Sequence, residues 1–105
     1  MGKRKNTLTV IARVLPDGQA MTIDGRPAWA LLELHRAGPE GCTPYHNPAP
    51  RWSHYVYQLR GLGFAVETIT ESHGGQFAGH HARYVLRSRI SLVVKSDQDG
   101  KRAAA

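Results

Sequence analysis

Residues 51–62, RWSHYVYQLRGL, separate into two faces when they are placed on a helix at about 100° per residue. One face is apolar and can pack against a small core; it carries Trp52, Tyr55, Val56, Leu59 and Leu62. The opposite face holds cations, a hydroxyl, an imidazole, an amide and a phenol, without a carboxylate; its members are Arg51, Ser53, His54, Tyr57, Gln58 and Arg60. The pattern predicts an amphipathic helix over residues 50–62.

The side chains of the polar face are of the types that contact nucleic acids. Arginine pairs bidentately with guanine and glutamine with adenine, which makes Arg51, Arg60 and Gln58 candidates for reading bases. Ser53 and Tyr57 can equally contact phosphates. Two plainer interpretations stay open, namely an ordinary solvated helix and, for Arg60, a salt bridge to a nearby carboxylate.

Composition points to a small basic domain. The 105 residues suffice for one domain, and the formal net charge is +6. Residues 1–50 contain six basic and four acidic side chains, whereas residues 51–105 contain eight and four, so most of the excess accompanies the predicted helix. Such a charge favours a polyanion as partner, first a nucleic acid, then an anionic membrane surface or an acidic protein.

Cysteine content and hydropathy limit the other classes. Cys42 is the only cysteine, which excludes an intramolecular disulfide and a cysteine-rich zinc site. The N-terminal MGKRKN is followed by a strand-like alternation, without a signal peptide or a membrane span. We therefore expect a soluble, cytoplasmic protein.

The first part of the chain predicts a hairpin and a helix. Residues 1–6 form a basic tail, expected to be disordered, in which Lys3, Arg4 and Lys5 can touch a DNA backbone. β-Branched residues at 7–15, turn residues at 16–18 and a return strand at 19–23 predict a β-hairpin over 7–23. Asp24 can cap a helix over residues 26–37, which ends at Gly38 and Pro39. On that helix His35 falls on the apolar stripe with Ala28, Leu31 and Leu32, as a core or half-buried histidine, and Trp29 packs at its edge.

The second part predicts another hairpin. Residues 41–50 (GCTPYHNPAP) contain three prolines and permit one helical turn after Thr43 at most, with Pro50 as the first residue of the following helix. Residues 64–71 and 82–87 read as antiparallel strands, which gives a hairpin over 64–87 around the glycine-rich loop 72–81. Residues 90–94 add a further strand, and residues 95–105 are expected to be a disordered tail, leaving one domain over residues 7–94.

The order helix, short turn, amphipathic helix, strand, glycine-rich loop, strand resembles the small winged helix-turn-helix domains of phages and other mobile elements. The similarity covers residues 29–86 and rests on WALLELHRAG, on YVYQLRGLGF leading into VETITE, and on GGQFAGHHARYVL. It implies an α+β winged helix-turn-helix fold with a C-terminal β-hairpin wing, to which the predicted N-terminal β-hairpin is an addition. It also implies DNA binding, with the second long helix as the recognition helix in the major groove. The chain departs from this family at the middle helix, which is replaced by the proline-rich segment.

The glycine-rich loop is the wing in this resemblance. Glycines allow close approach to a sugar-phosphate backbone, and a cationic side chain can enter a narrow minor groove. The candidate wing residues are His73, Gly74, Gly75, Gln76, His80, His81 and Arg83. The alternative is a solvated hairpin loop.

Metal binding and catalysis are not supported. The spacing of His73, His80 and His81 matches no zinc signature, and adjacent histidines on a strand point to opposite faces. Glu67 and Glu71 share a strand face but lack an evident cleft or base. We expect neither a cofactor, nor a metal, nor an enzyme.

Three functions are compatible with the sequence. The first is a sequence-specific binder of double-stranded DNA, a transcription regulator or a recombination and excision accessory factor of a mobile element. The second is a winged helix used as a protein-interaction module, such as a phage-encoded inhibitor or adaptor. The third, a single-strand or RNA binder, is disfavoured because Phe64, Val66, Tyr84 and Leu86 look like core. The hairpin over 7–23 either extends the wing sheet or joins two copies as a homodimer.

Overall fold

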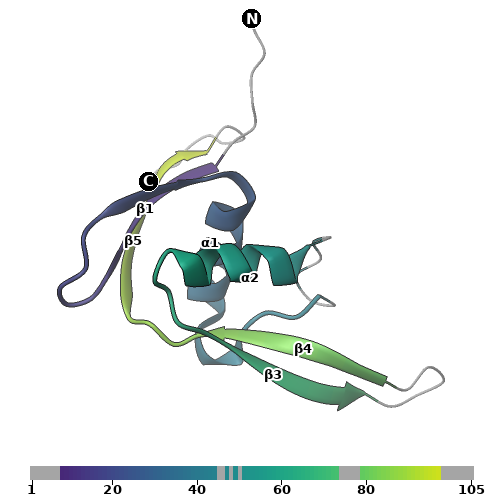
Figure 1. The fold of residues 1–105 in the computed structure, drawn as a ribbon. Coiled ribbons are helices and arrows are strands. Elements are labelled where there is room, and N and C mark those ends of the chain that lie inside the picture. Colours follow the sequence, from purple (N-terminus) through teal and green to yellow (C-terminus); the bar gives the residue numbers. More distant parts are fainter. Residues whose placement is uncertain (1–7, 45–46, 48, 50, 74–78, 98–105) are drawn as a thin grey trace, which may run out of the picture.

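The structure is a computed structural model that describes residues 8–44, 47, 49, 51–73 and 79–97. Its order is β1 (Leu8–Val14), β2 (Met21–Asp24), α1 (Gly25–Ala37), the 3-10 helix η1 (Gly38–Glu40), α2 (Trp52–Gly61), β3 (Val66–His73), β4 (Gly79–Leu86) and β5 (Ile90–Asp97). The α+β class with two β-hairpins, expected from the sequence, is confirmed. Figure 1 shows both helices between a three-stranded sheet and the projecting β3–β4 hairpin.

The three-stranded sheet has the order β2–β1–β5, with both neighbours antiparallel to β1. Val10 and Ala12 alternate inward from β1 and are fully buried, as the period of a strand requires. Because β1 pairs with β5, the N-terminal hairpin does not extend the β3–β4 sheet. Residues 95–97 belong to β5, which corrects the expectation of a disordered tail from residue 95, while residues 98–105 lie outside the described part.

Helix α1 packs against the sheet on one side and α2 and β4 on the other. Its fully buried side chains include Ala30 and Leu34 as well as the predicted Ala28 and Leu31, because two partners cover a wide arc of the helix. His35 is exposed, so its prediction as a core or half-buried residue is wrong. It lies in the last turn of α1, beside an open pocket rather than beneath a covering element.

The start of α1 differs in detail from the sequence prediction. Asp24 occupies the N-cap position, but its side chain makes no capping bond and instead accepts a hydrogen bond of 2.8 Å from the hydroxyl of Thr9. At the other end, Gly38 adopts φ +60° and stops the helix. The carboxylate of Asp24 therefore ties the helix entrance to β1.

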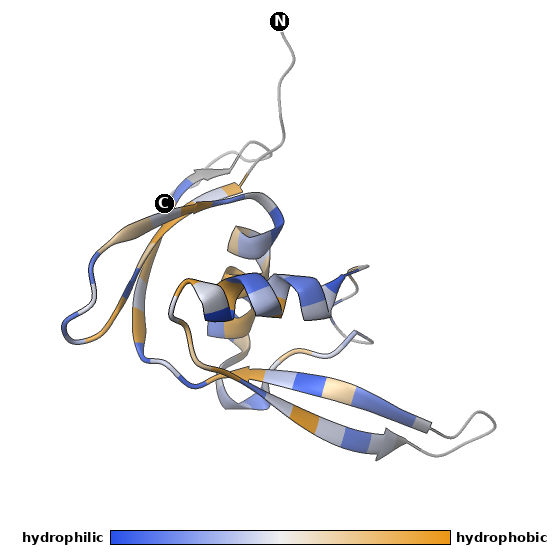
Figure 2. Ribbon diagram, in the orientation of Figure 1, coloured by the Kyte–Doolittle hydropathy of each residue, from blue (hydrophilic) through white to orange (hydrophobic). Residues whose placement is uncertain are grey.

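The two strands of the β3–β4 hairpin extend further than predicted. Ser72 and His80 are cross-strand partners, as are His73 and Gly79, so the strands extend into the segment predicted as a loop. The hydrogen bonds that pair two strands join backbone groups, so the pairing can continue where the side chains are polar. A hydropathy pattern therefore does not mark where the strands end. Figure 2 shows hydrophobic residues on β1, β5 and the base of the hairpin, and a mainly hydrophilic outer half of the hairpin.

A short contact joins the α1–α2 connection to the hairpin. Cys42 forms an isolated antiparallel bridge with Tyr84 of β4, with N–H to O distances of 2.8 and 2.9 Å. Gly41, at φ +70°, makes this approach possible, because a Cβ there would collide with the carbonyl of Tyr84. The bridge fixes the hairpin relative to the helices.

Candidate nucleic-acid interface

Helix α2 presents its polar face to solvent. Ser53, Tyr57, Gln58 and Arg60 are exposed, as is Arg51 at the N-cap, whereas His54 is half-buried. Tyr57 is the most exposed large hydrophobic residue among the described residues, at 74% exposure. In the described part of the chain, the six side chains predicted for this face are therefore at least partly accessible to solvent.

The other face of α2 lies in the core. Trp52, Tyr55, Val56 and Leu59 are buried, as the apolar pattern predicts. Leu62 is 44% exposed, which corrects its assignment to the buried face. The helix ends at Gly61, so Leu62 no longer follows the helical periodicity that placed it inside.

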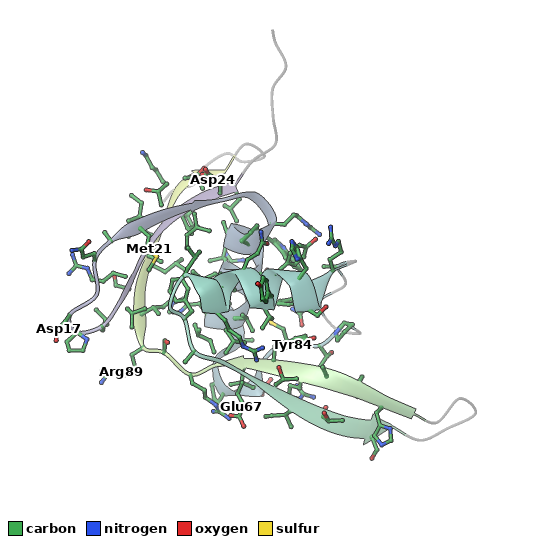
Figure 3. The ribbon with its side chains drawn as sticks, viewed as in Figure 1. Asp17, Met21, Asp24, Glu67, Tyr84 and Arg89 are labelled. Carbon is green, nitrogen blue, oxygen red and sulfur yellow. The ribbon has the colours of Figure 1, made fainter. Side chains whose placement is uncertain are left out.

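An aromatic stack anchors the N-terminal end of α2. The indole of Trp52 packs against Trp29 at 5.3 Å between ring centroids and stacks on Tyr84 at 5.8 Å and 19°. Tyr84 belongs to β4 of the hairpin and lies beside α2, as Figure 3 shows. The stack therefore connects α1, α2 and β4 through one side chain.

Asn47 ties the proline-rich connection to both helices. Its carbonyl accepts a hydrogen bond of 2.6 Å from the indole N–H of Trp52, and its side-chain amide donates one of 3.0 Å to Glu33 of α1. Its backbone N–H bonds to the carbonyl of Thr43 at 2.9 Å, which is one helical turn, the most that the sequence permits there. Pro48 and Pro50 lie outside the described residues. Within the described part of the chain, tertiary contacts thus support α2 where the resembled family has a middle helix.

Arg60 is bound to the hairpin. Its Nε and Nη2 atoms donate hydrogen bonds of 3.0 and 2.6 Å to the carbonyl of Val66, and Nη2 donates a third of 2.9 Å to the hydroxyl of Thr68. Its partners are thus a carbonyl and a hydroxyl, where sequence reasoning weighed a carboxylate. The guanidinium holds the C-terminal end of α2 against β3.

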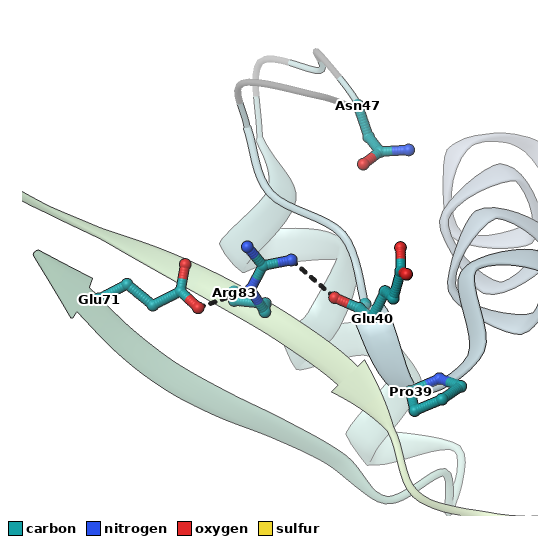
Figure 4. Close-up of a pocket in the computed structure, with 6 residues that line it drawn as sticks. Pro39, Glu40, Asn47, Glu71 and Arg83 are labelled. Carbon is teal, nitrogen blue, oxygen red and sulfur yellow. Dashed lines mark hydrogen bonds and ion pairs between the residues drawn. The ribbon is translucent and has the colours of Figure 1, made fainter. Parts of the chain in front are cut away.

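The outer half of the β3–β4 hairpin carries a charged cluster around Glu71. The carboxylate of Glu71 accepts a hydrogen bond of 2.6 Å from Nε of Arg83 and lies 3.0 Å from Nε2 of His81. Arg83 also donates a hydrogen bond of 2.7 Å to the carbonyl of Glu40 in η1, which Figure 4 shows beside a pocket. The hydrogen bond from Arg83, reinforced by that from His81, lowers the pKa of Glu71, and Glu71 in turn raises the pKa of Arg83.

The predicted wing residues are therefore divided by the structure. His81 and Arg83 lie in the hairpin stem and contact Glu71, whereas His80 is exposed on β4. His73 closes β3, opposite Gly79. Six predicted site residues lie outside the described residues: Gly74, Gly75 and Gln76 of the loop, and Lys3, Arg4 and Lys5 of the tail.

Sequence reasoning missed Arg26. This exposed residue of the first turn of α1 lies with its Cζ 4.7 Å from the ring centroid of Trp29 and 5.6 Å from that of Tyr55. The i, i+3 spacing of Arg26 and Trp29 on a predicted helix is a signal for this contact. It adds a cation beside the N-terminal half of α2.

The described residues offer no prepared metal or thiolate site. Among them, no group of three His, Cys, Asp or Glu side chains is placed to hold a metal ion. Burial, with a further contribution from Glu33, raises the pKa of Cys42 to about 11. The thiol is accordingly protonated at neutral pH, which is the reverse of an activated nucleophile. Neither of the described helices is long and apolar enough to cross a bilayer.

Comparison with known proteins agrees with this geometry. A family model described as a winged helix domain matches residues 20–96, well over half of the chain. No curated protein and no solved structure matches. The match covers both helices and the β3–β4 hairpin, and ends within β5.

Proposed function

Because the chain belongs to the winged helix domain family, we propose that it binds specific sites on double-stranded DNA, with α2 in the major groove. In this proposal the β3–β4 hairpin is the wing, which contacts the backbone or a narrow minor groove. Winged helix domains are typically non-enzymatic DNA-binding modules. The finer role that we propose is that of a transcription regulator or a recombination accessory factor of a mobile element.

The polar face of α2 carries the proposal. It is exposed, rich in hydrogen-bond donors and free of carboxylates, whereas the opposite face is buried. A helix of this kind fits a groove lined by phosphates and base edges. We propose that Arg51 and Gln58 read bases. Ser53 and Tyr57 are proposed to contact phosphates. His54 lies on the helix surface between the base-reading pair and the phosphate-contacting pair.

Carboxylates close to the proposed interface are already occupied. Glu67 pairs with Arg87 at 2.7 Å and Glu71 with Arg83 at 2.6 Å. Paired carboxylates repel a phosphate backbone less than isolated ones, because the neighbouring cation offsets their field. The arrangement lets an acidic β3 strand lie beside a DNA-binding helix.

A mobility-shift series tests the proposal. A site selected from random duplexes should be bound with an affinity that falls steeply between roughly 50 and 200 mM salt, because several phosphates are neutralised. Arg51→Ala/Gln58→Ala should weaken that site by roughly 2–6 kcal/mol and relax its sequence preference, since each bidentate pair contributes about 1–3 kcal/mol. Arg36→Ala, on the exposed end of α1, is the matched control and should bind as wild type does. A double variant with unchanged affinity and preference would remove α2 as the reading element.

A second candidate function is a protein-interaction module. The observation that favours it is the connection before α2, where the described residues form one 3-10 helix and one turn instead of a middle helix. A different connection before α2 changes the angle of this helix relative to the rest of the domain. The basic face could then bind an acidic protein in place of DNA. Failure of any duplex to shift at low salt would favour this module over the DNA binder.

We also propose that the protein forms a homodimer through the N-terminal hairpin. Both edges of β1 are paired, so the contact would use the outer edge of β2 or the outer face of the sheet. Light scattering should then give twice the chain mass at micromolar concentration. A monomer mass would exclude this dimer.

A further inference from the structure

Arg26 is held beside α2 by aromatic rings rather than by a carboxylate. Besides its two ring contacts, its Nε donates a hydrogen bond of 3.3 Å to the hydroxyl of Tyr55. An aromatic face attracts a guanidinium without cancelling its charge. The side chain is exposed, so a full positive charge is kept in a defined place at the surface.

The same contacts locate Arg26 at the N-terminal half of α2. Trp29 packs on Trp52, the first residue of α2, and the ring of Tyr55 lies 6.4 Å from that of His54. His54 belongs to the polar face. Arg26 therefore borders this face on the side of α1.

No carboxylate among the described residues pairs with the charge of Arg26. Arg83 and Arg87 pair with carboxylates, and Arg60 donates to a carbonyl. Asp24, two residues before Arg26, accepts its hydrogen bond from Thr9. Within the described residues Arg26 has no ion pair, and its Nη1 and Nη2 groups make no hydrogen bond.

We propose that Arg26 binds a phosphodiester of the DNA strand that flanks the groove occupied by α2. The ligand follows from the chemistry, because a guanidinium with both Nη groups available matches the oxygens of a phosphate. Phosphate contacts fix the register of a protein on the duplex without reading its sequence. This inference rests on the proposed DNA binding and adds a second anchor, on α1, to that of the hairpin.

The first test is a salt series with the full-length chain on its selected duplex. Arg26→Gln should reduce the slope of log affinity against log salt by about 0.9, with roughly tenfold weaker binding at low salt and an unchanged sequence preference. Arg89→Gln is the matched control, because Arg89 is also exposed and lies at the opposite end of the sheet from Asp24 (Figure 3). It should keep the wild-type slope. Equal slopes for Arg26→Gln and Arg89→Gln would overturn the inference.

The second test identifies the phosphate. In a series of duplexes with one neutral methylphosphonate each, wild type should lose roughly tenfold at the position that Arg26 contacts, and Arg26→Gln should lose nothing further there. Equal losses for both proteins at every position would contradict the contact. If Arg26→Gln unfolds, Arg26→Lys, which keeps the charge, replaces it. This variant should bind DNA more weakly than wild type, with the same slope of log affinity against log salt. Binding equal to wild type would overturn the role of the planar guanidinium. Wild type that binds no duplex would instead refute the proposed function itself.

Discussion

Arg60 shows how an exposed polar side chain can serve the fold rather than a ligand. Sequence reasoning places it among the base-reading residues, because its helical position is polar. In the structure, its guanidinium donates three hydrogen bonds to Val66 and Thr68. Reaching a base would require breaking these bonds, so we expect Arg60 to position the hairpin rather than to select sequence.

Replacing Arg60 tests this assignment. Arg60→Ala should lower the free energy of unfolding by about 1–2 kcal/mol, because the carbonyl of Val66 loses its charged donor. Urea denaturation measures the change, and sequence preference on a selected duplex should stay as in wild type. Arg36→Ala is the control, since its ion pair with Glu33 spans 4.0 Å and its side chain is 67% exposed; it should change stability by less than about 0.5 kcal/mol. If Arg60→Ala prefers a different base at some position of the site, Arg60 contacts a base and is not only structural.

Glu71 gives a prediction with a defined pH dependence. The hydrogen bonds from Arg83 and His81 lower its folded-state pKa below the ordinary value of 4.5. A carboxyl whose pKa is lowered by folding stabilises the protein above its unfolded-state pKa, and this contribution is lost as pH falls through the folded-state pKa. Wild type should therefore be more stable than Glu71→Gln at neutral pH, and the difference should shrink to zero in acid.

Thermal unfolding of both proteins across pH provides the measurement. Glu67→Gln is the control, because its partner Arg87 lies in a more exposed pair, with side chains 49% and 51% accessible. Its effect at neutral pH should be the smaller of the two. A difference between wild type and Glu71→Gln that persists unchanged at the lowest pH would show that the ion pair is not its source.

At the scale of elements, α2 is positioned by an aromatic stack and one asparagine. The family match confirms the winged helix fold expected from the sequence, although the proline-rich connection lacks the usual middle helix in its described part. Trp52 compensates by joining α1, α2 and β4, and Asn47 links its indole to Glu33. We infer that the angle of α2 depends on this pair of residues.

Trp52→Phe tests the support of α2. The phenyl ring keeps much of the stacking but leaves the carbonyl of Asn47 without its donor, at a cost of about 1–3 kcal/mol. Urea denaturation should show this loss, and DNA affinity should fall because α2 is held less firmly. Trp29→Phe is the matched control, since no indole hydrogen bond of Trp29 is present among the described residues, and it should cost less. Equal losses for the two variants would assign the effect to ring volume alone.

At the scale of the whole molecule, β1 joins the two ends of the domain. The family match begins at residue 20 and so includes β2 and most of β5 but not β1, which lies between them in the sheet. Val10 and Ala12 of β1 are fully buried in the core. Without β1, the strands β2 and β5 would lose their common partner.

A fragment of residues 20–96 should therefore lack a cooperative unfolding transition. Burial of Val10 alone contributes roughly 1.5–3 kcal/mol, and the sheet pairing and the other β1 side chains add to it, against a typical total of about 5–15 kcal/mol. Circular dichroism during heating measures the transition. A fragment of residues 8–97, which keeps every described strand, is the control and should unfold as the full chain does. A fragment of residues 20–96 that unfolds at the same temperature would show that β1 is dispensable.

The sequence by itself determined the features that depend on neighbouring residues. Helical periodicity located α2 and divided Trp52, Tyr55 and Leu59 from the polar face, because burial of one helix face imposes a repeat of about 3.6 residues. Strand propensity and turn residues likewise predicted the two hairpins. Local patterns carry this information because the hydrogen bonds of a helix and the closure of a hairpin lie within a short stretch of chain.

Only the tertiary structure decided which polar residues are left for a partner. In the sequence Arg60 and Arg83 are candidates for DNA contacts, yet they are bound by Val66 and Glu71, whereas Arg26 is exposed on aromatic rings. His35 follows the buried period but is exposed beside an open pocket, while its neighbour Leu34 in the same turn of α1 is buried. The pairing of β1 with β5 was likewise decided by the tertiary structure. Each depends on side chains or strands that meet across long sequence separations, and the geometry of those meetings is set by packing of the whole core rather than by any local pattern.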